Sequence, residues 1–293
     1  MNIQAAKTKL AAIPVSCNKD CAAGCPLLAH VKNGKIIKIT NNPAGTTHMQ
    51  GCSKGFQAMQ AAYSPDRLLK PMIRTGSKVS NNFKAVSWDE ALDFVAEGLS
   101  TIKEKYGADS LMFLGGSGSC RGALHNTYSL TERFLNMFGS NVKKYGNYSS
   151  SASDFVTPFV FGTNEVGFDA GTLQHSRMII LWGANIMDTR FGCEYPGRIS
   201  EALKNGVPVI VIDPRKSNTA KLPNVQWIQI RPGTDTAMMA AVLYELIDKN
   251  LVDYSYLDKY CIGFDKIKNY ILGTDDNQIK TPACAEQICG TKA

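Results

Sequence analysis

Four cysteines near the start of the chain have the type and spacing to hold an inorganic redox centre. Cys17, Cys21 and Cys25 lie four residues apart, and Cys52 follows from a later segment. A [4Fe-4S] cluster takes four thiolate ligands, and a proline commonly follows a ligand, as Pro26 follows Cys25 here. The pattern therefore favours a [4Fe-4S] cluster that carries electrons.

Two other uses of these cysteines are weaker interpretations. A structural zinc site prefers close C-x2-C pairs, which this segment lacks. A disulfide scaffold is typical of small secreted domains, whereas this chain has 293 residues and nine cysteines, an odd number. The remaining cysteines are scattered and are interpreted as buried or incidental thiols: Cys120, Cys193, Cys261, Cys284 and Cys289.

Composition indicates a globular chain with one large domain or two ordinary ones, because 44% of the residues are hydrophobic. The formal charge of +7 suits an anionic ligand, but no long Lys/Arg run calls for nucleic acid. The apolar stretch at Met178–Trp182 is too short to span a bilayer. The first residues contain neither an apolar signal core nor a twin-arginine pair, so the chain as written is expected in the cytoplasm.

The cysteines belong to a small N-terminal module with a β-hairpin. Asn33-Gly34 separates two apolar runs and is a strong hairpin signal between the third and fourth cysteines. From Ser87 to Gly107 the apolar residues recur at helical spacing, which predicts an amphipathic helix. We predict an iron-sulfur module over residues 1–60 and an α/β domain over 61–293.

Strand-like and helix-like segments alternate in that second domain. Strands are expected within residues 110–116, 177–185, 208–215 and 226–235, and helices near 124–138, 194–204 and 234–250. This alternation predicts an α/β fold with a Rossmann-like parallel sheet. Ligands of such sheets lie beyond the carboxyl ends of the strands.

The residues at those strand ends are candidates for nucleotide or cofactor binding. They are Gly116, Ser117, Trp182, Gly183, Asn185, Asp213, Arg215, Gly233 and Asp235. Each has a structural alternative: the glycines form turns, Asp213 caps a turn, and Thr234 or Asp235 caps a helix. No phosphate-binding glycine fingerprint is present, so the argument depends on the set as a whole.

The sequence YGNYSS at residues 145–150 is a further loop that could provide an oxygen ligand to a metal. Its structural alternative is a helix start in which Ser151 and Asp154 form a capping box.

An ordered set of motifs resembles the molybdopterin oxidoreductases, most of all the dimethyl sulfoxide reductase type. The motifs are CNKDCAAGC, GCSKG, AYSPDRLLKPM, SWDEALD, YGNYSS, WGAN, IDPRKSNTA and IRPGTDTAM. The resemblance runs from Pro14 to the end of the chain. It implies a [4Fe-4S] cluster and a molybdenum bis(molybdopterin guanine dinucleotide) cofactor.

The resemblance also implies residue roles. Ser149, or its neighbour Ser150, matches the serine that ligates molybdenum, and Lys54 matches a basic residue between cluster and pterin. The residues that match pterin-dinucleotide loops are Asn185, Asp213 and Asp235. Arg190 and Arg215 are expected at the pyrophosphate.

The activity implied is reduction of S-oxides or N-oxides by oxygen-atom transfer, with a ferredoxin-like iron-sulfur subunit and a membrane anchor subunit as partners. Because the resemblance covers only the N-terminal part of such enzymes, we expect a fragment with little activity alone. If the N-terminus is incomplete, a membrane-associated or exported complex is expected. The alternatives are a relative that acts on another oxo-compound or carries tungsten, and a non-catalytic electron-transfer module. A nicotinamide dehydrogenase is disfavoured because the glycine fingerprint is absent.

Overall fold

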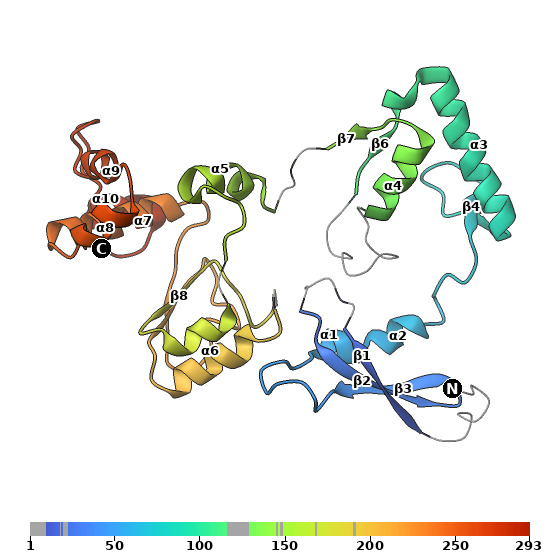
Figure 1. Cartoon of the computed structure of the whole chain (residues 1–293), viewed down its shortest axis with the longest axis horizontal. Helices are drawn as coiled ribbons and strands as arrows, with labels where there is room; N and C mark the ends of the chain where they lie inside the picture. The colour runs from blue at the N-terminus through green and yellow to red at the C-terminus, as the bar shows by residue number, and fades with distance from the viewer. Residues whose placement is uncertain are drawn as a thin grey trace. The chain divides into compact units, whose positions relative to one another are not determined.

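The computed structural model describes residues 10–17, 19, 23–115, 129–144, 146, 149–167, 169–189 and 192–293 (Figure 1). The chain divides into an N-terminal unit, Met1–Asp169 with Arg190–Tyr195, and a C-terminal unit, Ala170–Thr189 with Pro196–Ala293. Within the described residues, no helix combines the length and the apolar character needed to cross a membrane.

The N-terminal unit begins with an antiparallel sheet of three strands, β1 (Ala11–Ser16), β2 (Pro26–Lys32) and β3 (Lys35–Asn41), in that order. The predicted hairpin between β2 and β3 is confirmed. Asn33 and Gly34 have φ angles of 51° and 75°, and a two-residue hairpin turn of type I′ needs positive values at both positions. Side chains alternate along β2, so Leu27 and Ala29 are buried on one face.

Two short helices and a hairpin lead from this sheet to a long helix. They are α1 (Ser53–Phe56), α2 (Ala58–Ala62), β4 (Met72–Arg74), β5 (Phe83–Ala85) and α3 (Trp88–Tyr106). The Ser87 hydroxyl accepts a hydrogen bond from the Glu90 N–H at 3.1 Å, and Gly107 ends the helix with φ 80°. Both ends of α3 lie where the sequence predicts them.

A second, parallel strand pair completes the N-terminal unit. β6 (Met112–Phe113) pairs with β7 (Val142–Lys143), and α4 (Ser129–Phe138) and α5 (Ser151–Phe161) are the accompanying helices. The first residues of the helix expected at 124–138 lie outside the described part. In the residues that are described, β6 pairs with β7 and does not extend the later sheet, so the four expected strand ends do not share one sheet.

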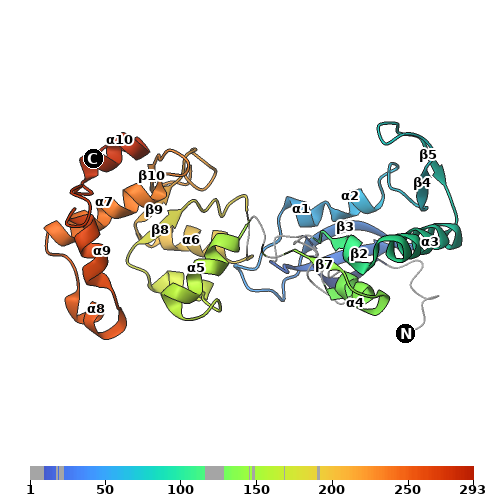
Figure 2. The same ribbon diagram turned by 90° about the horizontal axis from the view of Figure 1, so that it is seen from above.

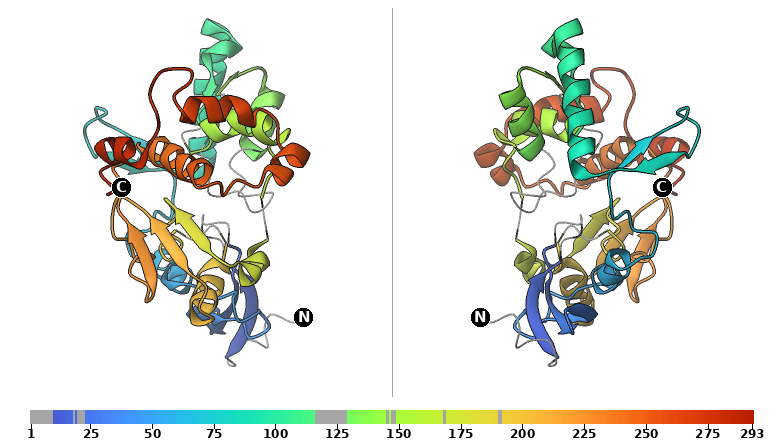
Figure 3. Two further views of the ribbon diagram at one scale, coloured as in Figure 1. Left: turned by 90° about the vertical axis from the view of Figure 1, so that its left-hand side faces the viewer. Right: turned by 90° about the vertical axis from the view of Figure 1, so that its right-hand side faces the viewer.

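The C-terminal unit contains the predicted Rossmann-like parallel sheet. Its strands β8 (Ile179–Trp182), β9 (Val209–Ile212) and β10 (Val225–Ile228) lie side by side in the order β10-β9-β8 (Figure 3). Helix α6 (Tyr195–Lys204) connects β8 to β9. Three of the four residues of β9 are buried, as expected for a central strand covered on both faces.

Four helices follow the sheet: α7 (Asp235–Asp248), α8 (Tyr254–Tyr260), α9 (Phe264–Ile271) and α10 (Pro282–Cys289) (Figure 2). Ile212 of β9 and Ile230, which follows β10, share a buried core with residues of α7 and α10. This core comprises Ile212, Ile230, Met238, Ala241, Ala285 and Cys289. The helices therefore hold the sheet by apolar burial.

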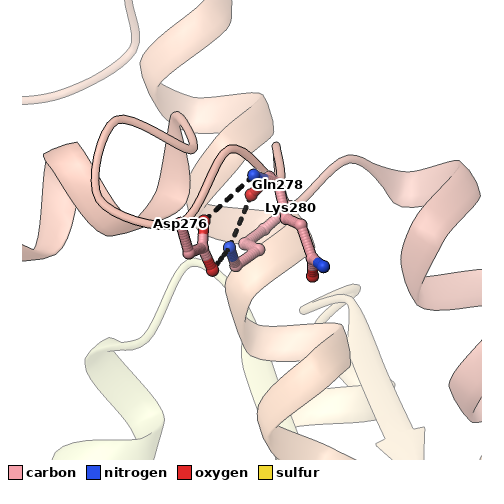
Figure 4. A network of polar contacts seen from close by, with 3 residues as sticks. All are labelled: Asp276, Gln278 and Lys280. Carbon is pink, nitrogen blue, oxygen red and sulfur yellow. Dashed lines mark hydrogen bonds and ion pairs between the residues drawn. The ribbon is translucent and has the colours of Figure 1, made fainter.

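A polar network fixes the turn between α9 and α10 (Figure 4). The Lys280 ammonium group donates to the Asp276 carboxylate and to the Gln278 carbonyl, each at 2.5 Å. The Gln278 N–H donates to the same carboxylate at 3.0 Å. Both hydrogen bonds lower the pKa of Asp276, and the bond from Lys280 has a larger effect than the bond from Gln278.

Candidate functional site

Two of the predicted cluster cysteines flank the start of the N-terminal sheet. Cys17 follows β1 and Cys25 precedes β2, and the Cys17 N–H donates to the Cys25 carbonyl at 2.9 Å. This bond continues the antiparallel pairing of the two strands beyond their ends. The sheet thus fixes the backbone of two predicted ligands relative to each other.

A glycine lets the helix that follows Cys52, the third predicted ligand, approach Cys17. Cys52 precedes α1, and its carbonyl accepts the N–H groups of Gly55 and Phe56 at 3.0 Å each. A Cβ added to Gly55 would lie 3.1 Å from the Cys17 sulfur, which is tighter than ordinary van der Waals contact. A side chain at this position would press on the Cys17 thiol, so glycine suits the close contact between Cys17 and the helix that follows Cys52.

Apolar residues surround Cys25 and Cys17, of which Cys25 is buried and Cys17 partly buried. Cys25 and Leu27 are buried, and Cys17, Met49 and Phe56 pack against them. Restricted solvent exposure is one of the factors that set the potential of an iron-sulfur cluster. The thiol donors and the apolar residues around Cys17 and Cys25 suit a [4Fe-4S] cluster in their chemistry.

Cys21, the fourth predicted ligand, lies outside the described residues. Across the described ranges, no group of three or more His, Cys, Asp or Glu side chains is arranged to hold a metal ion. Lys54 lies on α1, two residues after Cys52, and its side chain is exposed.

The second set of predicted residues gathers at the carboxyl edge of the β8–β9–β10 sheet. The Trp182 indole N–H donates to the Asp235 carboxylate at 2.7 Å, which joins the end of β8 to the start of α7. The Gly183 N–H donates to the Ile212 carbonyl at 2.8 Å, which joins β8 to the end of β9. Long-range contacts thus bring these predicted residues together.

Asp213 follows β9 and is only 7% exposed. One of its carboxylate oxygens accepts the Arg215 N–H at 2.9 Å, so the side chain caps its own turn. The Trp227 indole N–H donates to the Asp213 carbonyl at 3.0 Å. The structural alternative for Asp213 is therefore present, and the same bonds hold its carboxylate at the sheet edge. The Arg215 side chain is exposed.

Asn185 belongs to a polar network that the sequence does not reveal. Its carbonyl oxygen accepts the Thr219 hydroxyl at 2.8 Å, and its amide donates to Asp188 at 2.7 Å. Asn218 donates to the other oxygen of Asp188 at 2.8 Å. The hydrogen bonds from Asn218 and Asn185 lower the pKa of Asp188, and the bond from Asn218 has the larger effect. The motifs WGAN and IDPRKSNTA contain Asn185, Asn218 and Thr219, whereas Asp188 lies outside both motifs.

Two glycines of the predicted set have backbone conformations that suit glycine. Gly183 has φ 64° and Gly233 has φ 76°. Thr234 occupies the N-cap position of α7, but its hydroxyl donates to the Arg231 carbonyl at 2.7 Å and makes no cap bond. The other predicted cofactor residues, Gly116, Ser117 and Arg190, lie outside the described residues.

Ser149 is exposed in the turn before α5, and Ser150 is the N-cap residue of that helix. The Ser150 hydroxyl donates to the Asp154 carboxylate at 2.8 Å. The structural alternative expected from the sequence is a helix start with Ser151 as the partner of Asp154. The helix does begin here, but Ser150 and not Ser151 bonds to the Asp154 carboxylate. The Lys144 ammonium group donates to the Gly115 carbonyl, which ties together the residues after β6 and β7.

Ser149 belongs to the N-terminal unit, whereas Asn185, Asp213 and Asp235 belong to the C-terminal unit. Each group is organised by contacts within its own unit.

Comparison with protein families gives two matches. Residues 11–64 match the model described as molybdopterin oxidoreductase Fe4S4 domain, and residues 67–279 match the model described as molybdopterin oxidoreductase. The second match alone covers most of the chain.

Curated relatives align with nearly the whole chain. Dimethyl sulfoxide reductase DmsA of Haemophilus influenzae is 33% identical over 95% of this chain and 38% of its own length. Trimethylamine-N-oxide reductase of the same organism is 32% identical over 90% of this chain and 34% of its own length. The chain thus spans less than two fifths of the length of these relatives.

Among solved structures, acetylene hydratase from Pelobacter acetylenicus has a similar fold. The TM-score is 0.64 at 24% identity, over 95% of this chain and 37% of that one. This similarity supports the α/β architecture.

Proposed function

Because this chain belongs to the molybdopterin oxidoreductase family, we propose that it forms part of a molybdenum enzyme that reduces S-oxides or N-oxides. The observation that carries the proposal is that one chain contains both a cysteine-rich module and a sheet edge with four polar side chains. These are Trp182, Asn185, Asp213 and Asp235. Relatives named as reductases of dimethyl sulfoxide and trimethylamine N-oxide support this substrate class.

The reaction breaks the S–O or N–O bond of the substrate. Two electrons and two protons are consumed, the oxygen atom leaves as water, and the sulfide or amine is released. The bound molybdenum cofactor supplies the site that accepts the oxygen atom, and the protein positions and tunes that cofactor. Ser149 is proposed as the metal ligand, with Ser150 as the neighbouring alternative.

The C-terminal unit is proposed to hold the dinucleotide part of the cofactor. A carboxylate accepts hydrogen bonds only, which suits the amino edge of a guanine, and Asp213 and Asp235 place carboxylates at the sheet edge. Trp182 holds Asp235 in one orientation, and Thr219 does the same for Asn185. Arg215 and Arg190 are proposed to contact the pyrophosphate.

The N-terminal unit is proposed to deliver the electrons one at a time. Cys17, Cys21, Cys25 and Cys52 hold the cluster, and Lys54 lies between cluster and pterin. We propose a ferredoxin-like iron-sulfur subunit as electron donor and a membrane anchor subunit, by analogy with the family. Cytoplasmic residence remains our proposal for the chain as written.

The function is tested with protein purified anaerobically from cells that express the complete gene. Reduction of dimethyl sulfoxide and trimethylamine N-oxide is followed with reduced methyl viologen as the electron donor. Changing residues that support a metal ligand costs roughly 10–100-fold, so Ser149→Ala, which removes the ligand itself, is expected to exceed about 100-fold. Ser150→Ala is the matched control and should retain most activity.

Equal activity of Ser149→Ala and wild type would remove the ligand role of Ser149, and a loss confined to Ser150→Ala would transfer it to Ser150. Iron and sulfide without molybdenum, together with no reduction of either substrate, would instead identify a non-catalytic electron-transfer module.

A further inference from the structure

Cys193 is buried in the same apolar group of residues as Cys25, although the two are far apart in sequence. Cys193 is 6% exposed and Cys25 is 4% exposed, and together with Leu27 they form one buried cluster. Cys17 packs against the same cluster. Cys193, which is not a predicted ligand of the iron-sulfur centre, therefore shares the apolar surroundings of the predicted ligands Cys17 and Cys25.

The path of the chain brings Cys193 to this position. Residues Arg190–Tyr195 belong to the N-terminal unit, although the segments on both sides belong to the C-terminal unit. Gly192, just before the cysteine, has φ 136°, and a Cβ there would lie 3.0 Å from the Tyr195 ring. The turn that places Cys193 among the buried residues Cys25 and Leu27 therefore requires a glycine.

We propose that Cys193 is a positioning residue of the iron-sulfur centre, whose buried side chain keeps water away from the Cys25 thiolate, while the Gln50 carbonyl lies 3.6 Å from the same sulfur. This inference rests on the proposed function, because it presumes that Cys25 ligates a cluster. Reduction adds one negative charge to the cluster, and that charge is less favourable in apolar surroundings than near water or a hydroxyl group. Cys193 therefore lowers the reduction potential of the cluster.

The test is a redox titration of the anaerobically purified chain, followed by EPR, with iron and sulfide measured in every sample. Cys193→Ser keeps the size of the side chain and introduces a hydroxyl group. At a fixed potential we expect it to raise the ratio of reduced to oxidised cluster about tenfold, which equals about 59 mV for a one-electron couple.

Three further variants separate this role from simple packing. Cys193→Val and Cys193→Ala keep the position apolar and should leave the ratio within about twofold of wild type, whatever they do to stability. Cys289→Ser is the matched control, because Cys289 is a thiol buried to 2% exposure in the core of the C-terminal unit. It should not change the ratio.

An unchanged ratio in Cys193→Ser with four irons retained would overturn the inference and leave the proposed cluster intact. A loss of iron in Cys193→Ser and Cys193→Val alike would also overturn it, because Cys193 would then be a ligand. A wild-type chain without iron and sulfide would refute the proposed cluster itself, and this inference with it.

Discussion

Removing the Thr219 hydroxyl should destabilise the C-terminal unit measurably. Thr219 is fully buried, and its hydroxyl donates to the Asn185 carbonyl oxygen at 2.8 Å and accepts the Met187 N–H at 3.1 Å. Thr219→Val preserves the shape of the side chain and deprives both partners of this hydrogen bond. A buried polar group left unsatisfied costs about 1–3 kcal/mol.

Asn185 and Met187 are only partly buried, so the low end of that range applies to each. The free energy of unfolding should fall by about 2 kcal/mol in total. At about 4 °C per kcal/mol for a domain of about 100 residues, the Tm should fall by about 8 °C.

Thermal and urea unfolding can be followed by tryptophan fluorescence, since Trp182 and Trp227 both lie in the C-terminal unit. Thr219→Ser keeps the hydroxyl and loses one methyl group, so it should cost only about 0.8 kcal/mol. Thr274→Val alters an exposed threonine and should stay within about 0.5 kcal/mol. If Thr219→Val and Thr274→Val have the same Tm and the same free energy of unfolding, the stabilising role of the Thr219 hydroxyl is refuted.

Two further predictions concern other hydrogen bonds. The pKa of Asp276 is lowered in the folded state because Lys280 and Gln278 donate hydrogen bonds to its carboxylate. The stability that this carboxylate contributes is therefore present above its unfolded pKa of about 3.9. It is lost as the pH falls through the lower pKa of the folded state. Asp276→Asn should therefore reduce the free energy of unfolding at pH 7, and its effect should become smaller as the pH falls below the unfolded pKa. Equal effects at pH 7 and at acid pH in urea titrations would contradict this. Ser87→Ala removes the cap of α3 and should cost about 1 kcal/mol, whereas Ser87→Asp keeps an acceptor for the Glu90 N–H and should cost much less. Equal losses in the two variants would show that the cap bond contributes nothing.

Local patterns in the sequence predict much of the fold. Asn33-Gly34 gives its hairpin because both residues tolerate positive φ, and Ser87 and Gly107 bound α3 for reasons contained within one turn of chain. The alternation of apolar strands and helices predicts the parallel sheet of the C-terminal unit. The placement of β6 could not be predicted in this way, since strand pairing depends on residues distant in sequence.

The candidate site shows the same division. The cysteine spacing predicts a cluster, and the strand ends predict where a cofactor binds. The Trp182–Asp235 bond and the burial of Cys193 in one apolar group with Cys25 join residues far apart in the chain, and no local pattern encodes them. Thr234 illustrates a second difficulty, because its hydroxyl has a nearby carbonyl as partner and does not form the cap bond that its position suggests.

The proposed function depends first on whether the N-terminal cysteines hold a [4Fe-4S] cluster. The most direct measurement is the iron, sulfide, zinc and molybdenum content of anaerobically purified protein, with EPR after reduction by dithionite. We expect about four irons and four sulfides per chain, a reduced-cluster signal, and loss of that signal in Cys52→Ser. Zinc without sulfide, with no signal after reduction, would contradict this expectation.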